Sequence, residues 1–402
     1  MRETPVVLRT AMECSTEDKV HNLFVSESTN PNKVALFIPS LAGGGAERVM
    51  LNLARGFAAQ GIEVDLVLAK AEGPYLAEVP PQINIVDLKA KRVLTSLPNL
   101  IRYLRKEQPA VLLSALEHAN VIALWARKLS NVHTRVVISV HVTLSQDSSN
   151  APTIRGRFFA PVAIKKFYPW ADTVVVVSKA AQQDLLLTTK LDPERVRVIL
   201  NPVISPDLFE KTKTRPEHPW FEPGQPPVIL GVGRLTQAKD FPTLIKAFAL
   251  VRKQRTARLM ILGEGEDRSK LEKLISDLEL QDDVCLPGFV NNPYAYMAHA
   301  SVFVLSSVFE GLPTVLIESL AIGTPVVATD CPSGPREILQ DGRYGPLVPV
   351  GNAQAIAEGV LACLQQTRSE NSQEDAWAPF ELNKIVQQYI DAFSNRQAPG
   401  PL

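Results

Sequence analysis

Short runs of β-branched and other apolar residues alternate along this chain with longer segments of helical spacing. Strand-like runs occupy residues 34–39, 62–69, 111–116, 136–140, 173–177, 196–200, 228–232, 259–262, 284–286, 302–305 and 325–328. Helical spacing covers residues 46–60, 240–254, 267–279, 313–322, 352–366 and 380–393. This alternation is typical of parallel sheets whose two faces are covered by helices. The chain is therefore predicted to be α/β, with two doubly wound parallel-sheet domains in tandem.

Proline content suggests where the two domains separate, because residues 205–227 contain six prolines and little periodicity. We predict a flexible extension over 1–30, a first Rossmann-like domain over 31–205, a linker over 206–227 and a second over 228–375. Residues 376–402 form a C-terminal helix and tail, and whether they pack back on the first domain is left open. Ligands of such domains bind at the carboxyl ends of the strands, so a shared ligand would lie in the cleft that the two domains face.

Composition narrows the classes of partner. Lys plus Arg and Asp plus Glu number 42 each, so no net charge recruits nucleic acid, and an anionic ligand must be held by local groups. No apolar run is long enough to span a membrane, and residues 1–31 lack the apolar core of a signal peptide. The four cysteines are far apart and form no CxxC pair, which fits a reducing compartment. We expect a cytoplasmic protein.

A glycine-rich turn, Gly43-Gly44-Gly45, joins the first strand to the first helix. Glycine lets the backbone approach a ligand closely, and a helix N-terminus offers unpaired amides to a phosphate. A flexible turn without a ligand explains the glycines equally well. The spacing is not the GxGxxG of a dinucleotide fold, which disfavours a nicotinamide-dependent dehydrogenase.

Two cations follow the first strand of the second domain. Gly231-Val232-Gly233-Arg234 ends this strand, and Lys239 comes five residues after the arginine. Arginine offers a bidentate fork and lysine a mobile point charge, so the two could neutralise a diphosphate. Two solvated surface cations are the alternative, and the paired glycines favour the diphosphate.

Two glutamates mark a further turn, from the strand at 302–305 into the helix at 313–322. Glu310 precedes this helix and Glu318 lies within it, among apolar residues. A carboxylate in an apolar helix is costly unless a partner pairs with it. Sugar or ribose hydroxyls are suitable partners, and we prefer them to a buried arginine or backbone amides.

Glu310 and Glu318 form an E-x7-E motif that resembles the retaining glycosyltransferases of family 4, whose GT-B fold has two Rossmann-like domains. The resemblance extends over residues 33–365 and includes the segments 43–48, 171–178, 201–203, 233–239, 263–265, 287–289 and 332–338. Lys179 stands where the family usually has an acid, and Pro202 replaces a glycine. The resemblance implies a GT-B enzyme that transfers a sugar from a nucleotide-sugar to an acceptor bound by the N-terminal domain.

The family's residue roles can be carried over to matching positions. Arg234 and Lys239 would bind the donor diphosphate and stabilise the leaving nucleotide. Glu310 would contact the donor-sugar hydroxyls and Glu318 the ribose. The other expected donor-binding positions, which contribute mainly backbone groups, are Gly44, Gly45, Gly233, Val290, Leu312, Thr314, Val315 and Leu316.

A histidine is also expected in the active site. His141 follows the strand at 136–140 and resembles the family's active-site histidine. His118 follows the strand-like run at 111–116 and is the rival. We favour His141, because a polar loop follows it, and expect it to contact the donor sugar and not to act as a nucleophile.

The resemblance implies retention of anomeric configuration, with a UDP-sugar as the default donor and GDP-mannose next. No Asp-x-Asp occurs in the sequence, so no metal cofactor is expected and the two cations should replace it. A GT-B nucleotide-sugar epimerase and a non-catalytic nucleotide-binding scaffold are the alternatives.

The acceptor is expected to be a saccharide or a lipid-linked saccharide used in cell-surface polysaccharide or glycolipid synthesis. Residues 154–170 mix four cations with five aromatic side chains. This composition suits a basic amphipathic helix that binds the inner face of an anionic membrane. It suits an ordinary helix packed on the protein core equally well.

Overall fold

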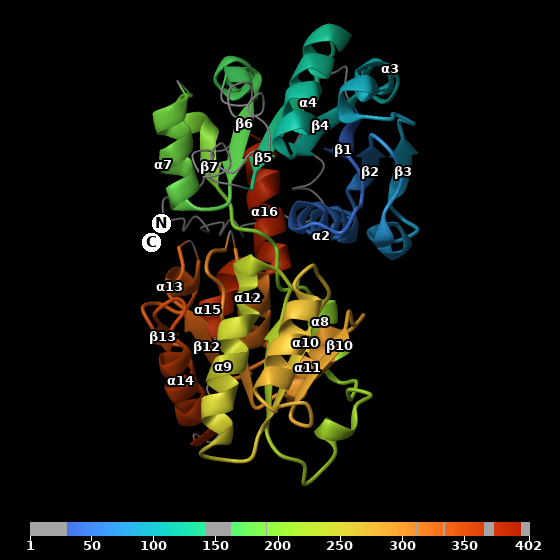
Figure 1. Cartoon of the computed structure of the whole chain (residues 1–402). Coiled ribbons are helices and arrows are strands. Elements are labelled where there is room, and N and C mark those ends of the chain that lie inside the picture. The colour runs from blue at the N-terminus through green and yellow to red at the C-terminus, as the bar shows by residue number, and fades with distance from the viewer. Residues whose placement is uncertain are drawn as a thin grey trace, which may run out of the picture. The chain divides into compact units, whose positions relative to one another are not determined.

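The computed structural model describes residues 30–141, 162–189, 191–310, 312–332, 334–365 and 374–394. These residues form two compact units, coloured in chain order in Figure 1. Unit 1 runs to Ile199 and resumes at Val386, and unit 2 is Leu200–Ile385. The predicted N-terminal extension lies outside the described residues, apart from residue 30.

Unit 1 is built on a seven-stranded parallel sheet of order β3-β2-β1-β4-β5-β6-β7. Its strands are β1 (Asn30–Ile38), β2 (Glu63–Leu68), β3 (Asn84–Asp87), β4 (Pro109–Ala115), β5 (Arg135–Val140), β6 (Thr173–Val176) and β7 (Val196–Val198). Its helices include α2 (Gly45–Ala59), α3 (Leu97–Glu107), α4 (Glu117–Ser130), α7 (Lys179–Thr188) and most of α16 (Leu382–Phe393).

Unit 2 repeats this architecture with six parallel strands in the order β10-β9-β8-β11-β12-β13. They are β8 (Val228–Val232), β9 (Arg258–Leu262), β10 (Val284–Gly288), β11 (Val302–Leu305), β12 (Val326–Thr329) and β13 (Leu347–Val348). The helices are α8 (Pro206–Thr212), α9 (Phe241–Arg252), α10 (Arg268–Asp277), α11 (Pro293–His299), α12 (Thr314–Ala321), α13 (Pro335–Ile338), α14 (Ala353–Gln365) and α15 (Glu374–Trp377).

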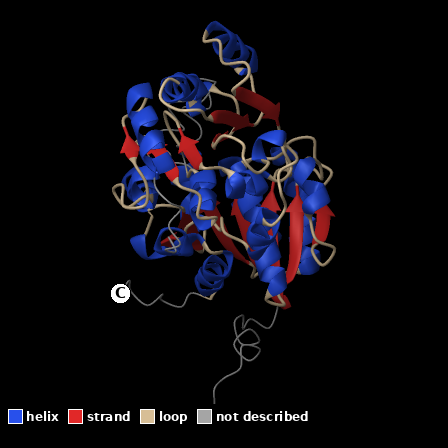
Figure 2. Ribbon diagram, turned by 90° about the horizontal axis from the view of Figure 1, so that it is seen from below, coloured by secondary structure: helices blue, strands red, loops and turns tan. Residues whose placement is uncertain are grey.

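The central strands are buried on both faces, as the apolar runs predicted. Residues 34–38 of β1 are all fully buried, although their side chains alternate between the two faces of the sheet. Helices flank the strands in each unit (Figure 2). The prediction of two parallel α/β domains is therefore confirmed. In each sheet, successive strands are added first on one side of the starting strand and then on the other. The switch falls between β1 and β4 in unit 1 and between β8 and β11 in unit 2, and ligands of such sheets bind at this point.

The boundary between the units differs from the predicted linker over 206–227. Unit 2 begins at Leu200, and the proline-rich segment contains α8. Pro206 occupies the first turn of α8, where the missing amide costs nothing. The carbonyl of Lys211 accepts a hydrogen bond from Asn292 Nδ2 at 3.0 Å, so the segment is part of unit 2. The proline content of this segment predicted a linker, but Pro206 starts a helix.

The C-terminal helix α16 belongs to unit 1 from Val386 onward, which answers the question that the sequence left open. Tyr389 and Phe393 are buried, and both rings pack on Phe57 of α2, at centroid distances of 6.4 and 5.5 Å. Aromatic packing of this kind buries a large apolar area and fixes the helix on the sheet's covering layer.

The segment over 154–170, considered as a membrane-binding helix, is described only from residue 162. Its aromatic residues at this end pack inward. Phe167 packs edge-on against Trp125 and Trp170, with ring centroids 5.2 and 5.0 Å apart. Both Phe167 and Trp170 pack against the core of unit 1. Lys128 Nζ lies 4.0 Å from the Trp170 ring centroid. The described part therefore matches the packed-helix alternative. Within the described ranges, no helix is long and apolar enough to cross a bilayer.

A buried charge network holds the amino ends of β1 and β2. Lys33 is 6% exposed, and its Nζ lies 2.7 Å from Glu63, 3.0 Å from Glu107 and 3.4 Å from Asp65. Asp65 also accepts a hydrogen bond from the Tyr103 hydroxyl at 2.6 Å. Burial alone would lower the pKa of Lys33, but the surrounding carboxylates raise it above its usual range.

We expect Lys33→Met to destabilise unit 1 by about 3 kcal/mol, because it leaves the buried Asp65 carboxylate without its cation. Lys106→Met is the matched control, since Lys106 is an exposed lysine that pairs with Glu107, and it should cost under about 1 kcal/mol. Urea unfolding followed by circular dichroism measures both. Equal shifts of the two midpoints would contradict a structural role for the network.

Candidate functional site

The loops after β8, β9 and β10 pack closely at the carboxyl edge of the unit 2 sheet. Gly233 N donates to Leu262 O and Gly263 N to Gly288 O, both at 2.9 Å. A Cβ atom at Gly263, whose φ is 138°, would collide with the carbonyl oxygen of Gly233. Only glycine fits there, because the two loops touch through their backbones. The loop that carries Arg234 is therefore held in place by backbone contacts.

Lys239 and Glu310 form an ion pair in unit 2, although they are 71 residues apart. Lys239 Nζ lies 2.5 Å from Glu310 Oε1, and the two side chains are 21% and 10% exposed. The hydroxyl of Ser307 also donates to Glu310 Oε1, at 2.5 Å. Ser306 donates to the carbonyl oxygen of Lys239 at 2.7 Å and so ties the β8 loop to the β11 loop. Two of the predicted site residues thus lie in direct contact.

Among the residues that the structure describes, Arg234 differs from Lys239 in having no side-chain partner. The side chain is exposed, and within the described part of the chain its guanidinium forms no hydrogen bond or ion pair. It lies one residue after Gly233, at the same sheet edge as Lys239. An unpaired guanidinium beside a half-buried lysine presents positive charge where ligands of this fold bind.

Glu318 lies in the second turn of α12 and is half-buried. Its Oε1 accepts a hydrogen bond from the Tyr294 hydroxyl of α11 at 3.3 Å. Neither alternative from the sequence, a buried arginine or backbone amides, accounts for this contact. Glu310 lies before the helix in the loop after β11, so the two glutamates are on different elements.

The amino end of α12 was predicted to offer amides to a sugar and phosphate. Thr314 N donates to Leu312 O at 2.9 Å, and Leu316 N donates to Pro313 O at 3.0 Å. Two of the four amides predicted here are therefore engaged within their own turn, and a ligand would compete with these bonds. Gly311, which precedes them, lies outside the described residues.

Val290, expected near the nucleotide base, follows β10 and packs its side chain against the apolar cluster under the sheet edge. Its neighbour Phe289 is 76% exposed. The valine side chain is therefore used for packing, and the predicted contact with a nucleotide would have to come from its backbone.

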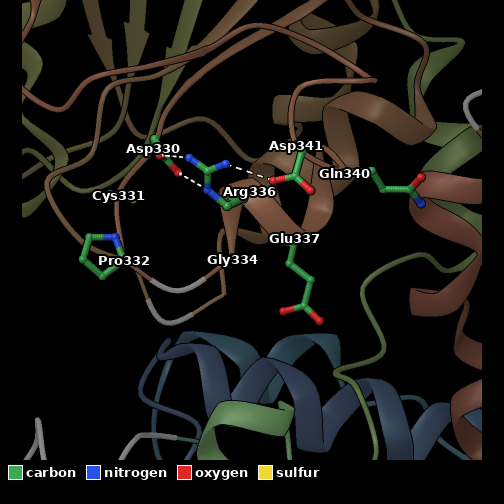
Figure 3. A pocket seen from close by; sticks show the side chains of 8 residues that line it. All are labelled: Asp330, Cys331, Pro332, Gly334, Arg336, Glu337, Gln340 and Asp341. Carbon is green, nitrogen blue, oxygen red and sulfur yellow. Dashed lines mark hydrogen bonds and ion pairs between the residues drawn. The ribbon is translucent and has the colours of Figure 1, made fainter.

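A pocket of about 680 Å³ opens beside this edge, after β12 (Figure 3). Arg336 lies in it, paired with Asp330 and, at 2.9 Å, with Asp341. Glu337 points away from these ion pairs (Figure 3). A Cβ atom at Gly334 would lie 2.7 Å from Pro313, so the pocket wall touches the turn before α12. With three carboxylates and one guanidinium, the pocket lining is negatively charged, which is unfavourable for a diphosphate. The residues that line it are Asp330, Cys331, Pro332, Gly334, Arg336, Glu337, Gln340 and Asp341.

Cys331 connects this pocket with the ion pair. Cys331 is 3% exposed, and burial together with the nearby Glu310 carboxylate raises the pKa of its thiol to about 11. Sequence reasoning missed Cys331, Ser307 and Tyr294 as neighbours of the glutamates. Ser307 could have been found, because it lies two residues after the end of the buried strand β11, at the edge where ligands of this fold bind. Within the described ranges, no group of three His, Cys, Asp or Glu side chains could hold a metal ion.

The glycine turn of unit 1 is held by the segment after β2. The carbonyl of Gly43 accepts a hydrogen bond from the Tyr75 hydroxyl at 3.2 Å, and the Arg48 guanidinium lies 3.7 Å from the Tyr75 ring centroid. Arg48 also forms a bidentate pair with Glu78, at 2.5 and 2.8 Å. Gly44 caps α2, and Gly45, its first residue, is exposed. The turn thus presents the first amides of a long helix to solvent.

His141 lies at the carboxyl end of β5 and is half-buried. Its Nε2 is 3.1 Å from the hydroxyl of Ser139, which lies 3.3 Å from the hydroxyl of Tyr389. The rival His118 lies in the first turn of α4 and is exposed. His141 therefore has a buried hydrogen-bonded support, as a positioned active-site histidine would.

Comparison with known proteins finds a glycosyltransferase family model for each of the two units. The model of "Glycosyltransferase Family 4" matches residues 43–204, and that of "Glycosyl transferases group 1" matches residues 212–376. A Campylobacter jejuni protein, N-acetylgalactosamine-N,N'-diacetylbacillosaminyl-diphospho-undecaprenol 4-alpha-N-acetylgalactosaminyltransferase, is 34% identical over 351 residues, which cover 84% of this chain and 91% of that protein. The amylovoran biosynthesis glycosyltransferase AmsD of Erwinia amylovora is 29% identical, over 78% of this chain and 85% of its own length.

Solved structures agree on the fold. HepE from Anabaena, in complex with UDP, matches with a TM-score of 0.71 and 20% identity over 89% of this chain and 98% of its own. A glycosyltransferase from Rickettsia africae matches with a TM-score of 0.74 and 19% identity over 92% of this chain and 98% of its own. The chain therefore belongs to glycosyltransferase family 4 and is a glycosyltransferase of the GT-B fold.

Proposed function

We propose that this enzyme transfers a sugar from a UDP-sugar to a lipid-linked saccharide, with retention of anomeric configuration and without a metal ion. The observation that carries the proposal is Arg234, unpaired within the described ranges and close in sequence to Lys239 of the Lys239–Glu310 pair, at the sheet edge where ligands of this fold bind. The names of relatives support the substrates. The C. jejuni relative is named for an undecaprenol-diphosphate saccharide, and HepE has been solved with UDP-glucose.

The proposed chemistry depends on stabilising the departing diphosphate, since sugar transfer leaves an electron-poor anomeric carbon and an anionic leaving group. Arg234 would bind the diphosphate through its two-pronged guanidinium, and Lys239 through its ammonium. The sequence holds no Asp-x-Asp, so we assign to these cations the role that a divalent metal has in other transferases.

Glu310 would orient the donor sugar with one oxygen. Both hydrogen bonds that it accepts from the described residues reach Oε1, from Lys239 and Ser307, which leaves Oε2 for a sugar hydroxyl. Glu318 would accept from the ribose in addition to Tyr294, and His141 would contact the donor sugar. A lipid-linked acceptor would bring the enzyme to the cytoplasmic face of the membrane.

A transfer assay tests this proposal. The purified protein is incubated with UDP-sugars labelled in the sugar, a lipid-diphosphate saccharide and EDTA, with GDP-mannose as a parallel donor. We expect label in the lipid product from one UDP-sugar, with the donor's α configuration kept in the nuclear magnetic resonance (NMR) spectrum of the new linkage. Transfer that requires a divalent metal, an inverted linkage or transfer from GDP-mannose alone would each overturn the corresponding part. Isomerised sugar without acceptor would indicate an epimerase.

A further inference from the structure

Three polar side chains, His141, Ser139 and Tyr389, form a hydrogen-bonded chain inside unit 1. Ser139 is fully buried on β5, and Tyr389 is 1% exposed on α16, 250 residues away in sequence. The Ser139 hydroxyl lies between the other two, 3.1 Å from His141 Nε2 and 3.3 Å from the Tyr389 hydroxyl. The carbonyl of Ser139 accepts from Asn120 Nδ2 at 3.1 Å, which fixes the strand end that carries the serine.

The direction of these hydrogen bonds follows from Tyr389. Burial raises the pKa of this phenol to about 12, so it keeps its proton at neutral pH. A buried hydroxyl that does not donate loses a hydrogen bond that water would supply. Ser139 Oγ is the acceptor that the structure records within reach of the Tyr389 hydroxyl, among the described residues. Tyr389 therefore donates to Ser139.

The serine proton then has one direction left. Ser139 carries a single hydroxyl hydrogen and, while it accepts from Tyr389, it can donate to its other neighbour, His141 Nε2. A nitrogen that accepts a hydrogen bond carries no proton. In neutral imidazole the proton must then be on Nδ1.

We propose that Tyr389 and Ser139 are positioning residues that hold His141 as the neutral Nδ1–H tautomer. This role deepens the proposed sugar transfer and rests on it, because the tautomer decides which ring nitrogen of His141 can donate a hydrogen bond to the donor sugar. The C-terminal helix thereby helps to position His141, although it contributes no residue that would touch substrate. Neither the spacing of motifs nor the resemblance pointed to Tyr389.

Imidazole tautomers are measured directly by NMR, independently of activity. The full chain is labelled with ¹⁵N-histidine, and the His141 signals are identified by their loss in His141→Gln. At a pH where the ring is neutral, we expect Nδ1 to show the shift of a protonated nitrogen and Nε2 that of an unprotonated one. A protonated Nε2 in the wild-type protein would overturn the proposal, whether or not the protein transfers sugar.

Two variants test the hydrogen bonds from Tyr389 to Ser139 and from Ser139 to His141. Tyr389→Phe frees the serine hydroxyl to accept, and Ser139→Ala removes the donor to Nε2, so both should shift the ring towards the Nε2–H form. We expect kcat to fall about tenfold while the donor KM changes less than about twofold, since one oriented hydrogen bond is lost. Tyr168→Phe is the matched control, because Tyr168 is also fully buried and its hydroxyl bonds to Asn120, not to Ser139.

The outcomes separate the two proposals. An unchanged tautomer in both variants would refute the role of Tyr389 and Ser139. A shift in Tyr168→Phe equal to that in Tyr389→Phe would reduce the effect to general loosening of the core, which also refutes it. Failure of the wild-type protein to transfer sugar would refute the proposed function, while the spectra would still decide the tautomer.

Discussion

Replacing Arg234 by alanine is expected to weaken UDP binding about a hundredfold, since two charge-assisted hydrogen bonds to the diphosphate are lost. Arg234 is exposed and unpaired within the described part of the chain, so the change removes no protein contact and should leave stability unchanged. Calorimetric titration with UDP, GDP and ADP, with EDTA present throughout, measures the effect and identifies the preferred base.

Lys246→Ala provides the matched control for Arg234→Ala. Lys246 is an exposed cation in the middle of α9, in the same unit, and its removal lowers the net charge equally. Binding by this variant should equal that of the wild type. A similar loss in both variants would mean that the nucleotide responds to net charge and not to a site at Arg234. Undiminished binding in Arg234→Ala would exclude this residue from the donor site.

Much of the fold could be predicted from the sequence because the central strands are buried on both faces. Such strands need continuous apolar runs, and residues 34–38 and 302–305 show them plainly. β3 escaped because it is an edge strand whose residues are mostly exposed, and β13 because it has two residues. α8 was missed because its first-turn proline, Pro206, lies in a proline-rich segment whose composition resembles that of a linker.

The site was predictable in parts. Since carboxyl ends of neighbouring parallel strands meet at one edge, the residues after β8 and β11 were expected to converge, and Lys239 and Glu310 do so. The partners that tune these groups were not predictable. Cys331 and Tyr294 occur in segments without distinctive spacing, and the helical spacing around Tyr389 predicts a helix but no partner for its hydroxyl. Only the folded chain shows which polar groups these three residues contact. A sequence pattern gives the edge of a sheet, but not the hydrogen bonds formed there.

The ion pair between Lys239 and Glu310 gives the second large effect. Lys239→Ala is expected to lower kcat about a thousandfold, since it removes a cation aimed at the charge that develops on the leaving diphosphate. The same change leaves the Glu310 carboxylate, which is 10% exposed, without its cation. A displaced Glu310 is therefore a second possible cause of the fall in kcat, besides the missing phosphate contact. The two causes predict different behaviour when the carboxylate charge is also removed.

The double variant Lys239→Ala with Glu310→Gln separates these causes. If Lys239 served only to hold Glu310, removing it from Glu310→Gln would cost nothing further, because an amide needs no cation. If Lys239 stabilises the leaving group, its removal still lowers kcat about a hundredfold or more in the Glu310→Gln background. We expect this second result. Lys239→Arg should keep part of the activity, since the charge remains. The longer guanidinium must fit beside Ser307 and against the backbone of Gly233, where an added Cβ atom would lie 3.2 Å from Lys239 Cε. Single-turnover rates measured for the four proteins of the cycle decide between the two roles, and equal rates for Glu310→Gln and the double variant would assign Lys239 to the support of Glu310 alone.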